Sequence, residues 1–113
     1  QDAVGSFGTW NNLSLLGGWS NYGSGYQTAQ YRKVGDIIQL RGLVVCGGSF
    51  TTNIAQMPSS LFYPASGRLI FYCWTSGSTY RIDVTNAGVI ACGGWTPTSG
   101  TIVSLDGIIF ARS

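Results

Sequence analysis

The chain has 113 residues, of which only 9% are charged, against roughly 25% in typical soluble domains, and it contains no His. A single domain of this length buries a small core without needing metal or disulfides to fold. The absence of His excludes Ser–His or Cys–His nucleophile activation and imidazole metal sites within the chain. The net charge of +2 is too small and too scattered for a nucleic-acid interface. We expect neither a metal nor a cofactor.

The apolar content is high for so few charges. Hydrophobic residues make up 44% of the chain, yet no apolar run approaches the ~18 residues that a membrane span requires, so we expect no membrane insertion. A monomer of this mass exposes about 6,000 Å². Six basic and four acidic side chains leave that surface sparsely charged. The excess apolar surface therefore predicts an interface between subunits.

Turn-forming residues divide the chain into short segments throughout. Residues 1–9 are small and weakly patterned, so we expect a linker from an upstream segment, followed by a β domain over residues 10–113. Strands are predicted near residues 10–16, 26–33, 37–46, 68–75, 79–85, 88–92, 101–105 and 108–112. No stretch has uninterrupted helical periodicity. The sequence thus predicts an all-β Greek-key sandwich or barrel of about 6–8 short strands.

Two predicted turns contain an Asp beside a Gly. Gly35-Asp36 and Asp106-Gly107 each separate two predicted strands. Tight turns with positive φ favour Asp-Gly and Asn-Gly pairs, so we interpret both Asp residues as turn formers between two strands. Residues 50–64 differ, because Pro alternates with apolar anchors without a period of two. There we expect a long, packed crossover loop of the kind that a Greek key needs.

Several predicted strands are apolar on both faces. Residues 43–46, 69–74 and 107–111 show no polar alternation. In so small a domain such strands imply a second buried surface, and a threefold contact between subunits would supply it. The three cysteines, Cys46, Cys73 and Cys92, have no metal or redox spacing. They are interpreted as buried thiols, with one disulfide and one leftover thiol as the alternative.

The segment at residues 80–85 alternates strictly between polar and apolar side chains. This pattern predicts one core face and one wet face, with Asp83 on the wet face beside Arg81. A pairing between these two side chains is favoured over catalysis. Glycosidic cleavage usually needs two carboxyl groups facing each other, and two of the remaining Asp residues lie in turns. A small glycan hydrolase or lyase using Asp83 is the enzymatic alternative.

The order of the motifs resembles a known family. The pieces are Trp10–Leu16, Gly18-Trp19, Tyr31–Gly42, Leu61–Pro64 and Val103–Ile108. Together they resemble the C-terminal head domain of phage tail-fibre and baseplate receptor-binding proteins, as found in phages of Gram-positive bacteria. Arg68 departs from the Arg-Pro arrangement usual in that family. The resemblance spans residues 10 to 112.

That resemblance implies a function and a location. It implies a trimeric β knob at the tail tip of a virion, joined to an upstream stalk or baseplate segment. The knob would adhere without covalent chemistry to saccharide on the host cell surface. A structural subunit of a capsid, tail or extracellular fibre, without ligand binding, is the alternative from the same low-charge composition.

Aromatic side chains are the candidate ligand contacts. Sugar C–H faces lie against aromatic rings, while polar side chains bind the hydroxyl groups. Trp74 and Trp95 flank turn-rich segments, whereas Trp10 and Trp19 are expected to pack internally. The predicted saccharide-binding residues are Trp74, Trp95, Tyr72, Tyr80, Arg81 and Asp83. No catalytic residue is predicted.

Overall fold

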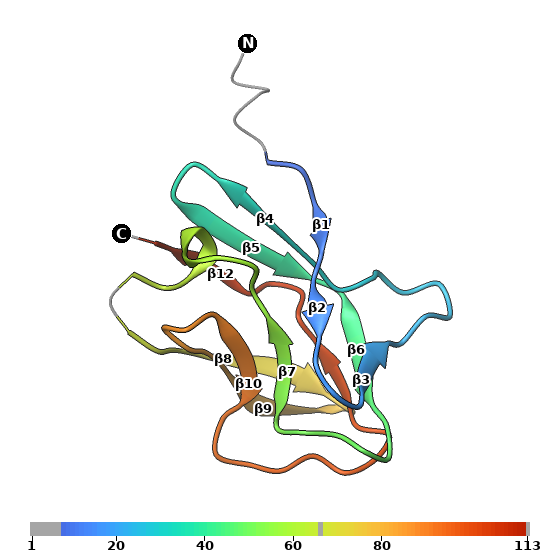
Figure 1. Ribbon diagram of the computed structural model, residues 1–113. Helices are drawn as coiled ribbons and strands as arrows, with labels where there is room; N and C mark the ends of the chain where they lie inside the picture. The colour runs from blue at the N-terminus through green and yellow to red at the C-terminus, as the bar shows by residue number, and fades with distance from the viewer. Residues whose placement is uncertain (1–7, 66, 113) are drawn as a thin grey trace.

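The computed structural model describes residues 8–65 and 67–112 (Figure 1). Its described part contains twelve short β-strands and one 3₁₀ turn, η1, at Ser60–Phe62. The predicted all-β fold class is confirmed. The predicted linker at residues 1–9 lies mostly outside the described residues, because these begin at residue 8. No helix in the described part is long and apolar enough to cross a membrane.

The smaller of two antiparallel sheets has four strands and occupies the upper part of Figure 1. Its order is β1 (Asn11–Asn12), β4 (Gln30–Val34), β5 (Ile37–Arg41) and β12 (Ile109–Ala111). Strands β4 and β5 form a hairpin in which Val34 pairs with Ile37. Gly35 provides the positive φ, 59°, at the first position of this two-residue turn. The predicted turn at Gly35-Asp36 is therefore confirmed.

The larger sheet has eight strands. Its order is β2 (Ser14–Leu15), β7 (Asn53–Gln56), β10 (Val89–Cys92), β9 (Ser78–Val84), β8 (Leu69–Thr75), β11 (Ile102–Ser104), β6 (Leu43–Cys46) and β3 (Trp19–Asn21). Strands β8, β9 and β10 follow one another through short turns, and β11 returns to pair with β8. This arrangement of four strands is a Greek key, as predicted.

The chain changes sheets where the sequence suggested continuous strands. Gly42 separates β5 in the small sheet from β6 in the large one, so the predicted single strand at residues 37–46 is two strands. Asp106-Gly107 likewise joins β11 to β12, which lie in different sheets. The predicted turn at Asp106-Gly107 is confirmed, and the Ile108 N–H donates to the Leu105 carbonyl across it. Only Gly107 has positive φ there, at 88°, and it redirects the chain between sheets.

The segment at residues 50–64 is more regular than predicted. It contains β7, which pairs with both β2 and β10, and it also contains η1. The expectation of a long irregular loop was therefore wrong for Asn53–Gln56. A four-residue strand spans only two periods of alternation, which is too few to distinguish it from a loop. Strand β3 was missed for the same reason.

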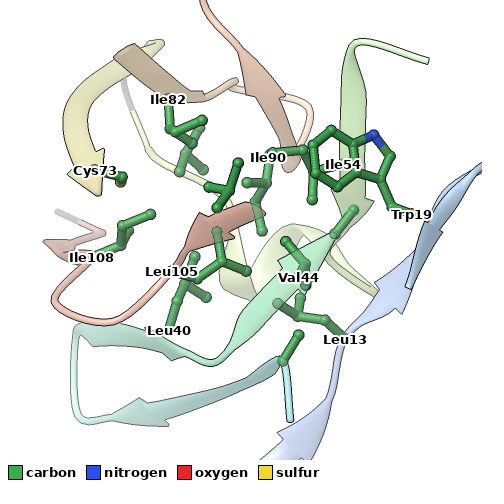
Figure 2. Close-up of a cluster of buried hydrophobic side chains, with 14 of the residues drawn as sticks. Leu13, Trp19, Leu40, Val44, Ile54, Cys73, Ile82, Ile90, Leu105 and Ile108 are labelled. Carbon is green, nitrogen blue, oxygen red and sulfur yellow. The ribbon is translucent and has the colours of Figure 1, made fainter. Parts of the chain in front are cut away.

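The core lies between the two sheets (Figure 2). Leu40 from the small sheet, Ile82 and Ile90 from the large sheet, and Leu105 and Ile108 from the sheet switch are all buried. These side chains meet in one cluster in Figure 2. Burial of this cluster fixes the relative positions of the elements that carry the candidate site.

The cysteines are buried and free. Cys46, Cys73 and Cys92 form no disulfide, so the interpretation as buried thiols is confirmed. Burial raises the pKa of Cys73 to about 11. Burial, followed by the nearby Cys46, raises the pKa of Cys92 to about 12. Cys73 and Cys92 are therefore protonated and unreactive at neutral pH.

Candidate functional site

An open pocket of about 320 Å³ lies beside the exposed ring of Trp74. We call it the Trp74 pocket; its lining consists of Tyr22, Tyr26, Gln27, Leu43, Trp74, Ile102, Ser104 and Asp106. Three of these side chains are aromatic and one is a carboxylate. The volume is at the lower end of the ~300–1,000 Å³ range for small-molecule sites. The pocket is large enough for one sugar ring of a longer glycan.

Strands β6, β8 and β11 form the floor of the Trp74 pocket. Side chains alternate along β8, so Cys73 and Thr75 point inward while Trp74 points outward and is 49% exposed. Leu43 and Ile102 come from the adjacent strands β6 and β11. The floor therefore belongs to the paired sheet, which holds its residues in a fixed arrangement.

The loop at residues 22–27 forms the wall of the Trp74 pocket. Both ends of this loop are bound to Leu43: the Tyr22 N–H donates to the Leu43 carbonyl, and the Leu43 N–H donates to the Gln27 carbonyl, both at 2.9 Å. Between these ends the rings of Tyr22 and Tyr26 meet edge to face, with centroids 5.5 Å apart. Edge-to-face contact is a favourable arrangement of aromatic rings.

Tyr22 and Tyr26 are site residues that sequence analysis missed. Gly23, Ser24 and Gly25 between them all have positive φ, at 76°, 53° and 85°. Tyr26 was placed at the start of the predicted strand at residues 26–33, and Tyr22 in no strand, whereas β4 begins only at Gln30. Two tyrosines flanking a Gly-Ser-Gly turn cannot both enter a core, and this signal in the sequence could have identified them. What sequence could not show is the long-range pairing with Leu43 that brings the loop to Trp74.

A second open pocket, of about 260 Å³, lies beside Trp95. We call it the Trp95 pocket; its lining consists of Thr75, Ser76, Ser78, Tyr80, Trp95, Thr96, Pro97, Thr98 and Thr101. The Trp95 indole N–H donates to the Arg81 carbonyl at 2.6 Å, and the ring meets Tyr80 edge to face at 4.8 Å. These contacts fix both rings, while Ser and Thr hydroxyls occupy the remaining wall.

Ser76 and Ile102 connect the linings of the two pockets through hydrogen bonds. The Ser76 N–H donates to the Ile102 carbonyl, and the Ile102 N–H donates to the Ser76 hydroxyl, both at 2.9 Å. Ile102 lines the Trp74 pocket and Ser76 lines the Trp95 pocket. Trp74 and Trp95 therefore lie in separate pockets on either side of one hydrogen-bonded pair, and not in one common site.

Asp83 lies in a buried ion-pair cluster. Its side chain is fully buried, with Arg81 Nε 2.8 Å from Oδ1 and Arg68 Nε 2.6 Å from Oδ2. The prediction of a wet face for Asp83 was wrong, because the arginines and the loop after β10 cover it. A Cβ on Gly93 would lie only 2.5 Å from Asp83 Oδ1. The predicted pairing of Asp83 with Arg81 is confirmed.

The ion pairs determine the charge state of Asp83. Burial raises the pKa of the carboxyl, but the hydrogen bonds and charges of Arg81 and Arg68 outweigh burial and leave its pKa below the ordinary value. The same pairing, chiefly the hydrogen bond to Asp83, raises the pKa of Arg81. Asp83 therefore stays ionised at neutral pH and is enclosed by cations. Its arrangement stabilises β9 and offers no surface to a ligand.

Tyr72 lies on the outer face of β8, two residues from Trp74. It is 70% exposed and pairs with Arg81 across β8 and β9. Neither Tyr72 nor Arg81 lines the Trp74 or Trp95 pocket. Of the six predicted ligand contacts, the structure thus places Trp74 in one pocket and Trp95 with Tyr80 in the other.

Trp19 packs internally, as expected, whereas Trp10 is half-buried and packs against two arginine side chains. Trp19 is buried, and its indole N–H donates to the Thr51 carbonyl at 2.8 Å. The guanidinium groups of Arg32 and Arg41 lie over the Trp10 ring, 4.5 and 4.0 Å from its centroid. These cation–π contacts account for the half-buried Trp10 ring. Across residues 8–65 and 67–112, no three Cys or Asp side chains gather to hold a metal ion.

The fold is similar to that of a solved phage protein. The crystal structure of the receptor binding protein (gp15) of Listeria phage PSA matches 93% of this chain with a TM-score of 0.69 and 20% sequence identity. The chain spans 65% of the length of that protein. The sequence itself matches no protein-family profile and no curated protein. The resemblance found in the sequence motifs is therefore confirmed at the level of the fold.

Proposed function

We propose that this domain is a receptor-binding head at the tail tip of a phage and that it adheres to host-surface saccharide without covalent chemistry. The observation that supports this most is the pair of aromatic-lined open pockets on a fold similar to that of the Listeria phage receptor binding protein. Aromatic rings present flat apolar faces to sugar C–H groups. Nearby hydroxyl, amide and carboxylate groups bind the sugar hydroxyls.

Both pockets have the properties of saccharide sites. The Tyr22–Tyr26 and Tyr80–Trp95 ring contacts hold four of the aromatic side chains in place, so their ordering on binding costs little side-chain entropy. The pockets are small and open, which favours weak binding to single sugar units. Several heads or subunits attached to one virion would multiply such affinities, because later contacts become intramolecular.

The proposed assembly is a homotrimer attached to an upstream stalk or baseplate segment. Ile70 and Ile109 are 51% and 50% exposed on the outer faces of β8 and β12. Together with Tyr72 they leave apolar surface on both sheets. Burial of such side chains between subunits is favourable at about 25 cal/mol per Å² of apolar surface. The trimer would place several copies of each pocket on one particle.

A binding role is favoured over hydrolysis. Asp83, the carboxylate proposed for the enzymatic alternative, is buried between two arginines and its pKa is lowered. A general acid in glycoside hydrolysis needs a raised pKa and access to the glycosidic oxygen. Asp83 meets neither condition. Saccharide would therefore be released unchanged.

The proposed function can be tested with surface polysaccharides from a panel of Gram-positive bacteria, including Listeria. The domain, immobilised through an N-terminal tag, should retain polysaccharide from its host strain. Trp74→Ala and Trp95→Ala should each weaken retention at least tenfold, because loss of a stacking ring removes about 1.4 kcal/mol or more.

Leu61→Ala is the matched control. Leu61 is 61% exposed but lines neither pocket, so its variant should retain polysaccharide as the unsubstituted domain does. Near-ultraviolet circular dichroism should show that all variants remain folded. Retention that survives in both tryptophan variants would remove the pockets from the proposal, and failure to retain any polysaccharide in the panel would refute the adhesive role.

A further inference from the structure

We propose that the Trp74 pocket binds a sugar residue that carries a protonated amino group, in preference to the N-acetylated form of the same sugar. This inference rests on the proposed saccharide-binding function and specifies its ligand. It follows from the electrostatics of the pocket, where aromatic rings and a carboxylate occur together without a compensating cation.

The aromatic part of the pocket attracts cations. Tyr22, Tyr26 and Trp74 all line it, and the indole of Trp74 is the ring type with the strongest cation–π attraction. Aromatic cages of this composition bind ammonium groups through the negative faces of their rings. An uncharged substituent would gain packing from the same rings but no electrostatic attraction.

Asp106 supplies a fixed negative charge at the rim. Its Oδ1 accepts a hydrogen bond from the Gly42 N–H at 2.8 Å, which orients the carboxylate. Its Oδ2 has no hydrogen-bond partner among the residues that the structure describes, and the side chain is exposed. One oxygen is therefore held by the fold while the other is available to a donor in the pocket.

No Lys or Arg is among the residues lining the Trp74 pocket. The six basic side chains are engaged elsewhere: Arg32 with Gln39, Lys33 with the Gly35 carbonyl, Arg41 with Gln30, Arg68 and Arg81 with Asp83, and Arg112 with the Tyr63 carbonyl. The charge of Asp106 is thus not neutralised by a cation lining the pocket. Covering this carboxylate with an uncharged ligand would desolvate it without compensation, whereas an ammonium group pairs with it.

A matched pair of probes isolates the amino group. The tetramer of β-1,4-linked glucosamine and the tetramer of N-acetylglucosamine have the same rings and linkage but differ in charge. Calorimetric titration of the domain at about pH 6, where amino groups are protonated, should give roughly tenfold tighter binding of the glucosamine tetramer. One carboxylate pair and one cation–π contact together account for a difference of that size.

Variants assign the preference to this pocket. Asp106→Asn keeps an oxygen that can accept from Gly42 but removes the charge, so the preference should fall to about threefold or less. Gln27→Glu adds a carboxylate to the same wall and should increase the preference. Trp74→Ala should abolish the preference for the glucosamine tetramer, because binding that remains at the Trp95 pocket does not involve Asp106. Leu61→Ala is the matched control, because Leu61 is exposed and lines neither pocket.

The outcomes separate this inference from the function on which it rests. Equal binding of the two tetramers, tighter binding of the N-acetylated tetramer, or no binding of either at about 10 mM would overturn the inference. An unchanged preference in both Asp106→Asn and Gln27→Glu would also overturn it. Retention of host polysaccharide that depends on Trp74 and Trp95 would still support the adhesive function. If the unsubstituted domain retained no host polysaccharide, both the adhesive function and this inference would be refuted.

Discussion

The carboxylate of Asp106 accepts a hydrogen bond from the backbone N–H of Gly42 at 2.8 Å, across 64 positions of the chain. Both residues lie where the chain passes from one sheet to the other. The Leu105 N–H also donates to the Gly42 carbonyl at 2.8 Å, so the two crossings are bound to each other twice. One of these contacts places Asp106 at the rim of the Trp74 pocket. The junction between the sheets therefore also shapes the candidate site.

Gly42→Ala should strongly destabilise the domain. Gly42 has φ of +120°, and a Cβ there would lie 2.4 Å from the Cα of Ala29. Backbone strain and overpacking together should lower the free energy of unfolding by about 3 kcal/mol or more. Urea denaturation at a fixed protein concentration would measure the loss.

Gly107→Ala is the matched control for this prediction. Gly107 has φ of +88° at the neighbouring crossing, but a Cβ there would meet no atom within 4 Å. Only backbone strain remains, so the free energy of unfolding should fall by about 1–2 kcal/mol. Equal losses of unfolding free energy in Gly42→Ala and Gly107→Ala would contradict the close packing of the Ala29 backbone against Gly42.

Asp83→Asn should lower the free energy of unfolding by about 2 kcal/mol. The substitution removes a buried charge that binds two arginines, which are themselves partly exposed and regain water. Thermal or urea denaturation would measure the change. An Asp83→Asn variant as stable as the unsubstituted domain would contradict a stabilising role for this cluster.

The Asp83 ion pairs also predict a pH dependence. The folded-state pKa of Asp83 lies below its ordinary value of about 3.9, so between these values the unfolded chain binds more protons than the folded chain. The stabilisation is complete above about pH 5 and is lost as pH falls through the folded-state pKa. Unfolding free energies measured from about pH 6 to pH 2 should fall less steeply in Asp83→Asn. The same pH dependence of the unfolding free energy in Asp83→Asn and in the unsubstituted domain would refute stabilisation by the Asp83 ion pairs.

The cysteines should react only after unfolding. Cys46, Cys73 and Cys92 are all buried, and the pKa values of Cys73 and Cys92 are raised to about 11 and 12. A thiol reagent at neutral pH should modify no cysteine in the folded domain within minutes and all three in denaturant. Rapid modification of Cys73 or Cys92 without denaturant would contradict their burial.

The oligomeric state is a separate prediction. Native mass spectrometry should give a trimer, because Ile70, Tyr72 and Ile109 expose apolar surface on a sparsely charged domain. Arg substitutions at Ile70 and Ile109 identify which sheet forms the contact, since a buried unpaired charge would dissociate the assembly. A stable monomer at about 100 μM would contradict the proposed trimer, while open filaments would favour the structural alternative.

Local patterns in the sequence predicted much of the fold. Alternation identified β9, and turn residues located the β4–β5 and β8–β9 hairpins. The same patterns could not show that Gly42 moves the chain to another sheet, because residues on both sides of Gly42 are patterned as strand and no turn cluster separates them. Strand pairing is a long-range property, and the short strands β3 and β7 carry too few residues to reveal it.

The candidate site was only partly predictable. Trp74 and Trp95 were identified because turns flank them, and the structure places both beside pockets. Their separation into two pockets depends on the pairing of β8 with β11, which sequence does not encode locally. Asp83 was misplaced because alternation along β9 cannot show that Arg68 covers its outer face.

The proposed function requires that saccharide contact the protein at Trp74 and Trp95. The chain has four tryptophans, so ¹⁵N-labelled domain gives only four indole N–H signals in a correlation spectrum. Titration with polysaccharide fragments from the host strain should shift the signals of Trp74 and Trp95 and leave that of the buried Trp19 in place. Saturable binding that leaves both the Trp74 and Trp95 signals unchanged would contradict the account.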